Sequence, residues 1–339
     1  MLAASGGMGK ILPLGAPIAQ NPLSVGAADS EATVVLGGSG FLGAHAVSMA
    51  LRRADIDHPV VSVSRGPGEG PLFGRHRSQP HFERADARDP DALLAALEGW
   101  RPARVINCLA LARGADCEED PLLASLLNAQ VPGLLARWCG RNGARLVHVS
   151  TDLVFGDAPP PAPGGFREQD APAPISAYGA TKAAGERAVL AACPRAIVVR
   201  LPLLYGASGG RELGASDSFL GAVERGDVPR LFSDEWRTPL LVEDAASALL
   251  ELAWGAGSGL LHVGGPDRVS RIQLGLALLI ARGLEPGDAE ARVSAARRAD
   301  AALDPPRPED TSLDSSRARV VLRTRLRGLR EGAARACAP

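Results

Sequence analysis

A tyrosine and a lysine four residues apart are the side chains in this sequence best suited to proton transfer. They are Tyr178 and Lys182, and the separate residue Thr151 adds a hydroxyl group. Side chains at positions i and i+4 lie on one face of a helix. Because an ammonium group favours a neighbouring phenolate, we expect Lys182 to lower the pKa of Tyr178 from about 10 towards neutrality. These residues predict a catalytic trio in which Tyr178 exchanges a proton with a substrate whose carbonyl oxygen is held by Thr151.

Residues 37–43 have the sequence GGSGFLG, which contains three spaced glycines. This segment follows the β-branched run at residues 33–36 and precedes an apolar stretch. Gly37 can form a tight turn, Gly40 lets a phosphate approach the backbone, and Gly43 lets a helix pack closely on a strand. The start of that helix offers free N–H groups and a partial positive charge to an anion. We therefore predict a dinucleotide-binding turn, with cofactor contacts from Gly37, Ser39, Gly40, Phe41, Leu42 and Gly43.

The end of the second predicted strand bears on which nicotinamide nucleotide binds. A carboxylate at this position holds the ribose hydroxyls of NAD, but this chain has Ser64 and Arg65 there. A guanidinium group and a serine hydroxyl both suit a 2′-phosphate, so we expect NADP(H) in preference to NAD(H). The alternative is that Arg65 only begins a solvated loop. After the third predicted strand, Asp86 is expected to accept from the adenine amino group, with Ala87 beside it.

The elements that must position these residues follow an alternating pattern. From residue 33 onward, short β-branched runs alternate with alanine-rich and leucine-rich stretches, which predicts an α/β fold with a doubly wound parallel sheet. Asp89 before Pro90 favours a helix start, and Gly99 and Gly143 favour helix ends. The predicted strands are residues 33–36, 60–64, 82–85, 104–108, 146–150 and 196–201, and the predicted helices are residues 41–53, 91–98, 121–141 and 177–192.

The chain is expected to divide into three regions. Residues 1–30 show no regular period and are predicted to be a flexible tail; a secretory signal is disfavoured because prolines interrupt its apolar stretch. Residues 31–201 would form the nucleotide-binding domain with the catalytic residues. Residues 202–339 would form mainly a smaller substrate-binding lobe. Residues 156–174 are dense in Pro and Gly and are interpreted as a binding flap. The elements predicted for the smaller lobe are residues 215–225, 228–232, 243–254, 260–263 and 270–282.

Composition argues against several classes of protein. Hydrophobic residues make up 46% of the chain, charged residues 22%, and the formal net charge is -1. No apolar run approaches the ~18 residues of a membrane span, and there is no basic block for nucleic acid. We therefore expect a soluble, cytoplasmic protein without a nucleic-acid or membrane partner.

The five cysteines lack CxxC spacing and the six histidines are scattered, so reduced thiols and no metal site are predicted. His148, within a predicted strand, is expected to be a hydrogen-bonded packing residue.

Together these motifs resemble the extended short-chain dehydrogenase/reductase family, and within it dTDP-4-dehydrorhamnose reductases and related sugar-nucleotide ketoreductases. The resemblance runs from about residue 33 to about residue 322. It implies that Thr151, Tyr178 and Lys182 form the active triad, and that Lys182 also holds the nicotinamide ribose. It further implies that residues 107–110 line the cofactor, among them Cys108, Leu109 and Ala110. The motifs that carry it are GGSGFLG at residues 37–43, VINC at 105–108, CEEDP at 117–121, NA at 128–129, STDLVF at 150–155 and YGATKAAGE at 178–186.

The resemblance also implies a substrate site and a mode of assembly. Residues 236–244 are similar to the family segment whose arginine grips a substrate diphosphate, which points to Arg237. A surface ion pair of Arg237 with Asp234 or Glu235 is the alternative. Arg307 resembles a second arginine on the phosphate side, and Asp152 would join Thr151 at the substrate. Family members commonly form homodimers through helices such as residues 121–141 and 177–192.

The residue after the Thr-Asp pair separates reactions within this family. Dehydratases place a glutamate there as a base, whereas Leu153 cannot abstract a proton. Epimerases hold NAD tightly, and Ser64 with Arg65 favours a dissociable NADPH instead. We therefore predict NAD(P)H-dependent reduction of a ketone, in particular a nucleotide-linked 4-keto deoxysugar. Residues 111–115 lack the family's Thr and Asp, so a different deoxysugar or a non-sugar ketone stays open. An epimerase remains an alternative, as does a non-catalytic NADP-binding subunit like that of methionine adenosyltransferase.

Overall fold

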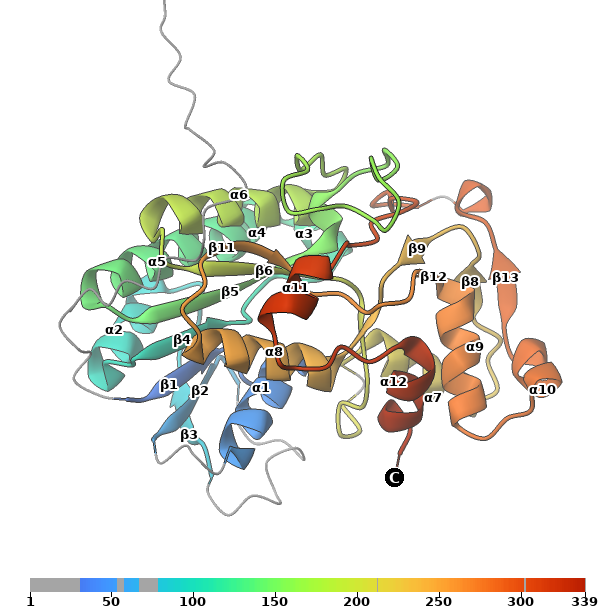
Figure 1. The fold of residues 1–339 in the computed structure, drawn as a ribbon, viewed down its shortest axis with the longest axis horizontal. Coiled ribbons are helices and arrows are strands. Elements are labelled where there is room, and N and C mark those ends of the chain that lie inside the picture. The colour runs from blue at the N-terminus through green and yellow to red at the C-terminus, as the bar shows by residue number, and fades with distance from the viewer. Residues whose placement is uncertain (1–30, 54–57, 67–78, 212, 302, 339) are drawn as a thin grey trace, which may run out of the picture.

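The computed structural model describes residues 31–53, 58–66, 79–211, 213–301 and 303–338. Within them, parallel strands form a seven-stranded sheet in the order β11-β6-β5-β4-β1-β2-β3 (Figure 1). The strand order reverses between β1 and β4, which confirms the doubly wound α/β fold. Ligands of such sheets bind beyond the carboxyl ends of the strands at this reversal. The strands are β1 (Thr33–Leu36), β2 (Val60–Ser64), β3 (His81–Arg84), β4 (Arg104–Asn107), β5 (Arg145–Thr151), β6 (Ile197–Leu201) and β11 (Gly259–His262).

Helices cover both faces of this sheet (Figure 1). Successive strand residues point to opposite layers, so Val34 and Val105 pack in one core while Val35 and Ile106 pack in the other. Burial on both faces explains why the strands are continuously apolar. One face carries α1 (Phe41–Arg52) and α8 (Val242–Trp254), and the other carries α2 (Pro90–Trp100), α5 (Val131–Asn142) and α6 (Ala177–Ala192).

The predicted elements of the first 201 residues are largely confirmed. All six predicted strands are present, with ends shifted by at most one residue. Helix α6 has the predicted bounds, and its cap residue Ser176 accepts a hydrogen bond from the backbone N of Gly179 at 3.2 Å. Gly143 ends α5 with a φ of 73°, as expected. The prediction that Gly99 ends a helix is wrong: α2 continues to Trp100, and Arg101 adopts the left-handed conformation with a φ of 43°.

The single helix predicted over residues 121–141 is interrupted. The chain forms α4 (Pro121–Ser125), a π-helical turn (Leu126–Gln130) and then α5, and the unpredicted helix α3 (Gly114–Glu119) precedes them. Within the π turn, the buried side chain of Asn128 accepts from the backbone N of Leu111 at 2.9 Å and donates to its carbonyl oxygen at 3.1 Å. It also donates to Oγ1 of Thr181 at 3.1 Å. The widened turn therefore ties the loop after β4 to α6.

Two elements that we expected in the smaller lobe belong to the sheet layers instead. Strand β11 pairs in parallel with β6 and forms an edge of the main sheet. Helix α8 packs against α1 and contacts β4, β5 and β6. Both assignments to the smaller lobe are therefore wrong, because the chain leaves the sheet after β6 and returns to it. Local apolar patterns do not show that return.

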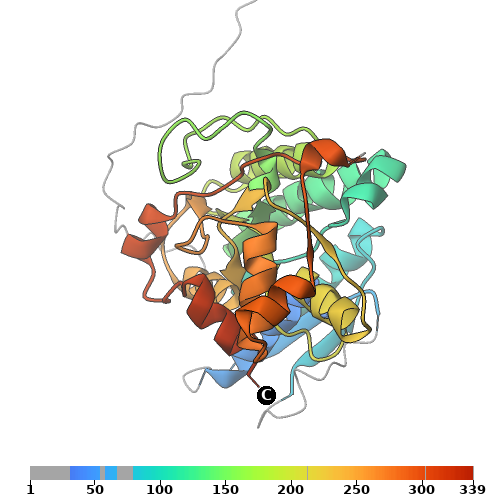
Figure 2. The same ribbon diagram turned by 90° about the vertical axis from the view of Figure 1, so that its right-hand side faces the viewer.

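The remaining C-terminal elements form the smaller lobe at the right of Figure 1, which faces the viewer in Figure 2. Its core joins α7, α9 and α12 through side chains such as Leu220, Leu278 and Ala333. The predicted elements at residues 215–225, 228–232 and 270–282 appear with shortened ends. The elements of this lobe are β7 (Leu204–Tyr205), α7 (Ala215–Glu224), β8 (Arg230–Phe232), β9 (Trp236–Arg237), β10 (Leu240–Leu241), β12 (Val269–Ser270), α9 (Arg271–Ala281), α10 (Pro286–Ala291), β13 (Ser294–Ala296) and α12 (Leu329–Ala336). Helix α11 (Ser316–Val321) does not belong to it, because it contacts β11 and its Ala318 lies in a core of the main sheet.

Residues 156–174 form turns and bends, without a helix or strand among them, as the Pro and Gly content predicts. Phe166 anchors this segment because its ring stacks on Phe155 with centroids 4.0 Å apart. Its backbone N also donates to the carbonyl oxygen of Ser312 at 2.7 Å.

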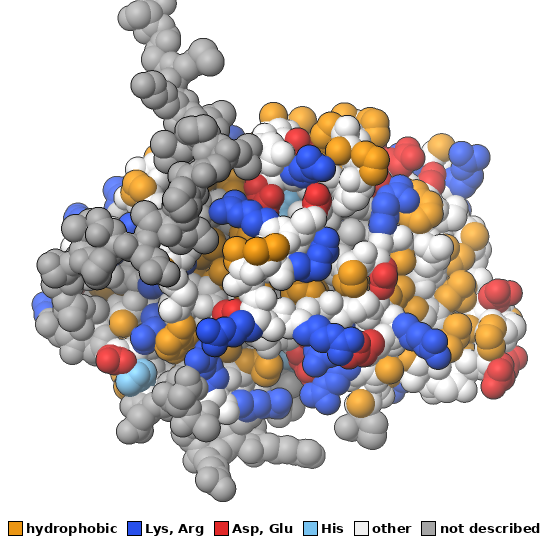
Figure 3. Space-filling view, viewed as in Figure 1, with side chains coloured by type: hydrophobic (Ala, Val, Ile, Leu, Met, Phe, Trp, Pro, Cys, Tyr) orange, Lys and Arg blue, Asp and Glu red, His pale blue; other side chains and the backbone are white. Residues whose placement is uncertain are grey.

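The predicted tail at residues 1–30 lies outside the described residues. On the face seen in Figure 3, basic side chains lie scattered among acidic and apolar ones. Among the described helices, none is long and apolar enough to cross a membrane.

Candidate active site

The glycine-rich segment forms the predicted turn between β1 and α1. Gly37 has a φ of 75°, a left-handed conformation that favours glycine. A Cβ at residue 43 would lie 2.1 Å from the carbonyl oxygen of Gly37, so Gly43 is required for close packing. Gly40 caps α1 without a side-chain hydrogen bond, which leaves the first N–H groups of the helix for an anion. The sequence pattern assigned no role to Gly38, yet its Cβ would lie 2.3 Å from Oγ of Ser62.

The carboxyl ends of β2 and β3 bring Ser64, Arg65 and Asp86 to one edge of the sheet. Oγ of Ser64 donates to the carbonyl oxygen of Gly66 at 3.1 Å, and Arg65 is exposed. The carboxylate of Asp86 pairs with Arg88 at 2.6 Å, and this hydrogen bonding lowers the pKa of Asp86 to about 2. Arg88 is therefore a second cation at this edge, which sequence reasoning missed.

Thr151, Tyr178 and Lys182 come together as predicted. Thr151 ends β5, where its Oγ1 donates to Oδ1 of Asp152 at 3.1 Å, and Tyr178 lies in the first turn of α6. A Cβ at Gly179 would lie 2.1 Å from the carbonyl oxygen of Leu153, so the start of α6 rests directly on the segment after Thr151. Lys182 is 2% exposed, and its Nζ donates to the carbonyl oxygen of Val149 at 2.6 Å.

The expected effect of Lys182 on Tyr178 is contradicted. Burial raises the pKa of Tyr178 well above its ordinary value, and the negative charge of Asp152 adds to this, while the nearby hydroxyl of Thr151 opposes it. Burial also lowers the pKa of Lys182 to about 8, opposed by the carboxylate of Glu186. The physical reason is that both groups are desolvated and the ammonium group of Lys182 is directed at a backbone carbonyl. In this structure the phenol is therefore held in its protonated form.

A buried ionic network lies behind the trio. The carboxylate of Glu186 accepts from Oγ of Ser150 at 2.6 Å and pairs with Nη2 of Arg200 at 2.7 Å. Nη1 of Arg200 contacts Nε2 of His262 at 3.2 Å, and Nδ1 of His262 donates to the carbonyl oxygen of Phe166. This chain of contacts links the catalytic strand to residues 156–174. Ser150 and Glu186 were noted from the sequence only as parts of motifs, and Arg200 was not noted.

The carboxyl end of β4 places Cys108, Leu109 and Ala110 beside the glycine turn. The backbone N of Cys108 donates to Leu36 at 3.0 Å, and a Cβ at Gly37 would lie 3.1 Å from the backbone N of Leu109. Burial raises the pKa of the Cys108 thiol to about 12, opposed by the charge of Lys182. His148 is a buried packing residue as predicted, because Nδ2 of Asn107 donates to its Nδ1 at 3.0 Å.

The predicted substrate arginine Arg237 is buried rather than exposed. It is 4% exposed, its Nε lies 3.5 Å from Oδ2 of Asp152, and its Nη2 lies 3.4 Å from Oε1 of Glu235. The ion pair with Glu235, which we held as the alternative, is therefore present, but in the interior. Thr311 donates to Asp152 at 2.7 Å, and burial raises the pKa of Asp152. Arg307 reaches Glu235 at 3.5 Å with half of its side chain exposed.

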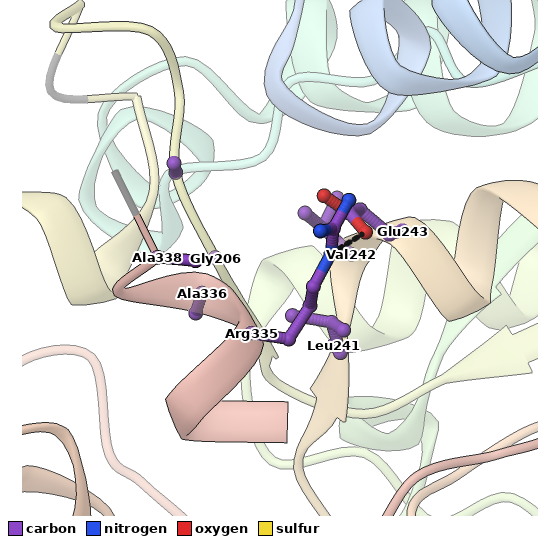
Figure 4. Close-up of a pocket in the computed structure, with 8 residues that line it drawn as sticks. Gly206, Leu241, Val242, Glu243, Arg335, Ala336 and Ala338 are labelled. Carbon is purple, nitrogen blue, oxygen red and sulfur yellow. Dashed lines mark hydrogen bonds and ion pairs between the residues drawn. The ribbon is translucent and has the colours of Figure 1, made fainter. Parts of the chain in front are cut away.

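A cavity of about 150 Å³ lies away from these residues, between residues 206–207 and α12. Figure 4 shows the side chain of Arg335 reaching from α12 towards Glu243 at the start of α8, where Nε and Oε2 are 2.8 Å apart. None of the predicted catalytic, cofactor or substrate residues lines this cavity. The predicted site residues are instead grouped at the carboxyl ends of β1, β4 and β5.

The chain is similar to one described protein family and to several known proteins. The family model described as RmlD substrate binding domain matches residues 32–339. The dTDP-4-dehydrorhamnose reductase of Mycobacterium tuberculosis is 35% identical over 260 residues, which are 76% of this chain and 77% of that protein. Methionine adenosyltransferase 2 subunit beta of Pongo abelii is 32% identical over 212 residues, 60% of this chain and 62% of that protein. The crystal structure of dTDP-4-dehydrorhamnose reductase from Bacillus anthracis in complex with NADP is similar with a TM-score of 0.74 at 21% identity, covering 91% of this chain and 98% of that one.

Proposed function

The chain belongs to the RmlD substrate binding domain family of extended short-chain dehydrogenase/reductases, and we propose that it reduces the keto group of a nucleotide-linked sugar. It is an NAD(P)-dependent oxidoreductase. The observation that supports the proposal best is the arrangement of the three predicted catalytic residues around the ends of β4 and β5. Thr151 ends β5, Tyr178 begins α6, and Lys182 contacts β5 at Val149 and acts on Cys108, which follows β4 beside the glycine turn.

The residues at the strand reversal fit a nicotinamide dinucleotide. The open turn at Gly40 leaves the backbone N–H groups of Phe41 and Leu42 for the pyrophosphate, and residues 108–110 would line the nicotinamide. When bound, the nicotinamide supplies a hydride to the carbonyl carbon. Ser64 and Arg65, with Arg88 nearby, are proposed to hold a 2′-phosphate, which makes NADP(H) the preferred cofactor.

The chain's own residues handle the proton. The phenol of Tyr178 is protonated at neutral pH, so it can donate its proton to the carbonyl oxygen as the oxygen gains negative charge. Thr151, at the end of β5 and near enough to act on the pKa of Tyr178, would hold the same oxygen. Lys182, whose Nζ donates to the carbonyl oxygen of Val149, is proposed to hold the nicotinamide ribose. Leu153 offers no base for elimination, so the reaction stops at the alcohol.

The substrate diphosphate is proposed to bind at the arginines beside Asp152. Arg307 is half exposed and lies 3.5 Å from Glu235, so its guanidinium group can still bind a phosphate. Arg237 lies behind it and is already paired with Asp152 and Glu235. We infer that Arg237 holds these carboxylates in place and adds its positive charge to the diphosphate site.

The test is a panel of nucleotide-linked 4-keto sugars offered with NADPH and with NADH, followed by the absorbance of the reduced nicotinamide. We expect turnover with at least one sugar, faster with NADPH. Tyr178→Phe should lower the rate by about 100-fold or more while NADPH still binds. The matched control is Tyr205→Phe, which changes the other tyrosine of the chain at a buried position whose hydroxyl has no partner among the described residues.

Two outcomes would contradict the proposal. Wild-type turnover in Tyr178→Phe would remove the phenol from the mechanism. Binding of NADPH without oxidation by any ketone would favour the second candidate, a non-catalytic nucleotide-binding subunit. That candidate draws on the 32% identity to methionine adenosyltransferase 2 subunit beta. The approach of Thr151 to Tyr178 favours the enzyme instead.

A further inference from the structure

Arg271 begins α9, directly after β12, and lies beside the charged residues around Arg237. Strand β12 pairs with β9 in antiparallel fashion, with Ser270 opposite Trp236 (Figure 1). In an antiparallel pair, one step forward on one strand meets one step backward on the other. Arg271 is therefore next to Glu235, the buried residue that precedes β9.

The two carboxylates of this group are already shared by two other arginines. Oε1 of Glu235 lies 3.4 Å from Nη2 of Arg237, and its Oε2 lies 3.5 Å from Nη1 of Arg307. The carboxylate of Asp152 lies 3.5 Å from Nε of Arg237. Arg271 adds a third positive charge to these two carboxylates, so positive groups outnumber negative ones here.

The guanidinium group of Arg271 has no hydrogen bond or ion pair within the described part of the chain. The residue is half-buried, so part of it is open to solvent. Burial lowers the pKa of Arg271, the carboxylate of Glu235 opposes this, and the charges of Arg307 and Arg237 add to it. On another side Arg271 lines a cavity of about 20 Å³ with apolar residues such as Phe219. A partly desolvated guanidinium group beside two other cations is stabilised by an added anion.

Two neighbouring arginines, by contrast, have carboxylates of their own. Nη2 of Arg268 pairs with Asp310 at 2.8 Å, and the guanidinium group of Arg268 also stacks on Trp236. Nη2 of Arg298 pairs with Glu309 at 3.0 Å. Their positive charges are neutralised locally and do not call for a ligand.

We propose that Arg271 binds the diphosphate of the nucleotide-linked substrate, together with Arg307. This inference rests on the proposed function, and it concerns a residue to which the sequence pattern assigned no role. A guanidinium group forms parallel, charge-assisted hydrogen bonds with phosphate oxygens. A diphosphate between Arg271 and Arg307 would also relieve the repulsion between the two cations. Helix α9 of the smaller lobe thereby contributes directly to substrate binding.

The first test is isothermal titration of dTDP and of UDP into protein saturated with NADP+, so that the cofactor site is filled. We expect Arg271→Gln to weaken the nucleoside diphosphate that the wild type binds by about tenfold or more, and to leave the affinity for NADP+ unchanged. The matched control is Arg282→Gln, which removes a positive charge from an exposed position at the other end of α9 and should bind as the wild type does. Arg271→Lys keeps the charge without the fork and should lose less.

The second test is the reductase assay with a nucleotide-linked keto sugar. Arg271→Gln should raise KM for the sugar by about the same factor and leave kcat within about twofold, because the diphosphate contact is present in both the ground state and the transition state. KM for NADPH should not change. A loss of kcat alone would contradict the inference.

Other results would also overturn it. One is wild-type affinity for the nucleoside diphosphate in Arg271→Gln; if that variant also melts at a lower temperature, Arg271 is only a counterion of Glu235. Another is an equal loss in Arg282→Gln, which would indicate a long-range charge effect. A wild type that binds neither dTDP nor UDP would overturn the inference as well. A wild type that binds one of them and reduces no keto sugar would instead overturn the proposed function, so the two failures are distinguishable. If melting curves show that Arg271→Gln is misfolded, Arg271→Lys takes its place.

Discussion

Replacing Lys182 with methionine should stabilise the folded protein at neutral pH while removing its activity. Lys182 is 2% exposed, and burial lowers its pKa from 10.5 to about 8 despite the neighbouring carboxylate of Glu186. The folded state therefore keeps a charge in a place that disfavours charge. Methionine fills a similar volume without it. A catalytic lysine that destabilises its own fold is expected where function and stability conflict.

The size of the effect follows from the two pKa values. A lowering from 10.5 to about 8, at about 1.4 kcal/mol for each pH unit, costs the folded state about 3 kcal/mol. Loss of the hydrogen bond from Nζ of Lys182 to Val149 offsets about 1 kcal/mol of the gain. The free energy of unfolding of Lys182→Met should therefore exceed that of the wild type by about 2 kcal/mol at pH 7.

The pH dependence has a definite direction. Below pH 8 the lysine is charged in both the folded and the unfolded chain, so the full cost of burying it is present. Between pH 8 and 10.5 the folded chain releases its proton while the unfolded chain keeps it, and the wild type therefore gains stability relative to the variant. Above about pH 10.5 both forms are neutral and the cost is gone. The advantage of Lys182→Met should fade over this interval.

Two measurements check this prediction. Urea unfolding of both proteins at pH 7 and pH 10 gives the difference in free energy, with Arg187→Met as the control that removes a charge from the exposed face of α6. The chain contains only two lysines, Lys10 and Lys182, so NMR of protein with 13C-labelled lysine can follow the titration of Lys182. A titration near pH 10.5, or a variant that is less stable at pH 7, would refute the reasoning.

Three further substitutions test the packing of the glycine turn, the end of α2 and the buried ion pair of Glu186 with Arg200. Gly43→Ala should lose NADPH binding in a titration and melt at lower temperature, because its Cβ would lie 2.1 Å from the carbonyl oxygen of Gly37. Gly99→Ala should raise the free energy of unfolding in urea by about 0.5–1 kcal/mol, since the space beside residue 99 is open and alanine favours the helix. Glu186→Gln should lower that free energy by about 3–5 kcal/mol, because Arg200 would remain buried and charged without its carboxylate; an unchanged unfolding midpoint would contradict this.

Local patterns were sufficient for most of the sheet and for α6. The strands of this sheet are buried on both faces, so their apolar runs are continuous and easy to recognise. Helix α6 has the predicted bounds, and in the structure Ser176 caps its start. The end of α2 was predicted too early because Gly99 remains in the helix. Arg101 rather than Gly99 takes the left-handed conformation.

The missed elements depend on contacts between distant segments. Strand β11 is a short apolar run that could pair at many edges, and only its place beside β6 makes it part of the main sheet. The π turn at residues 126–130 follows from the buried hydrogen bonds of Asn128 to Leu111 and Thr181. Gly38 was missed because its role comes from close packing against Ser62.

The sequence by itself determined which groups could do chemistry and in what order they occur. Residue types and short spacings suffice to predict the glycine turn, the Tyr178 and Lys182 pair, and the alternation that brings Thr151 to a strand end. Only the tertiary structure decided the protonation of those groups and the partners of the arginines. A pKa depends on burial and on charges from other elements, and those distances are set when the whole chain packs. That is why Tyr178 is held protonated here, contrary to the prediction from its spacing to Lys182 alone.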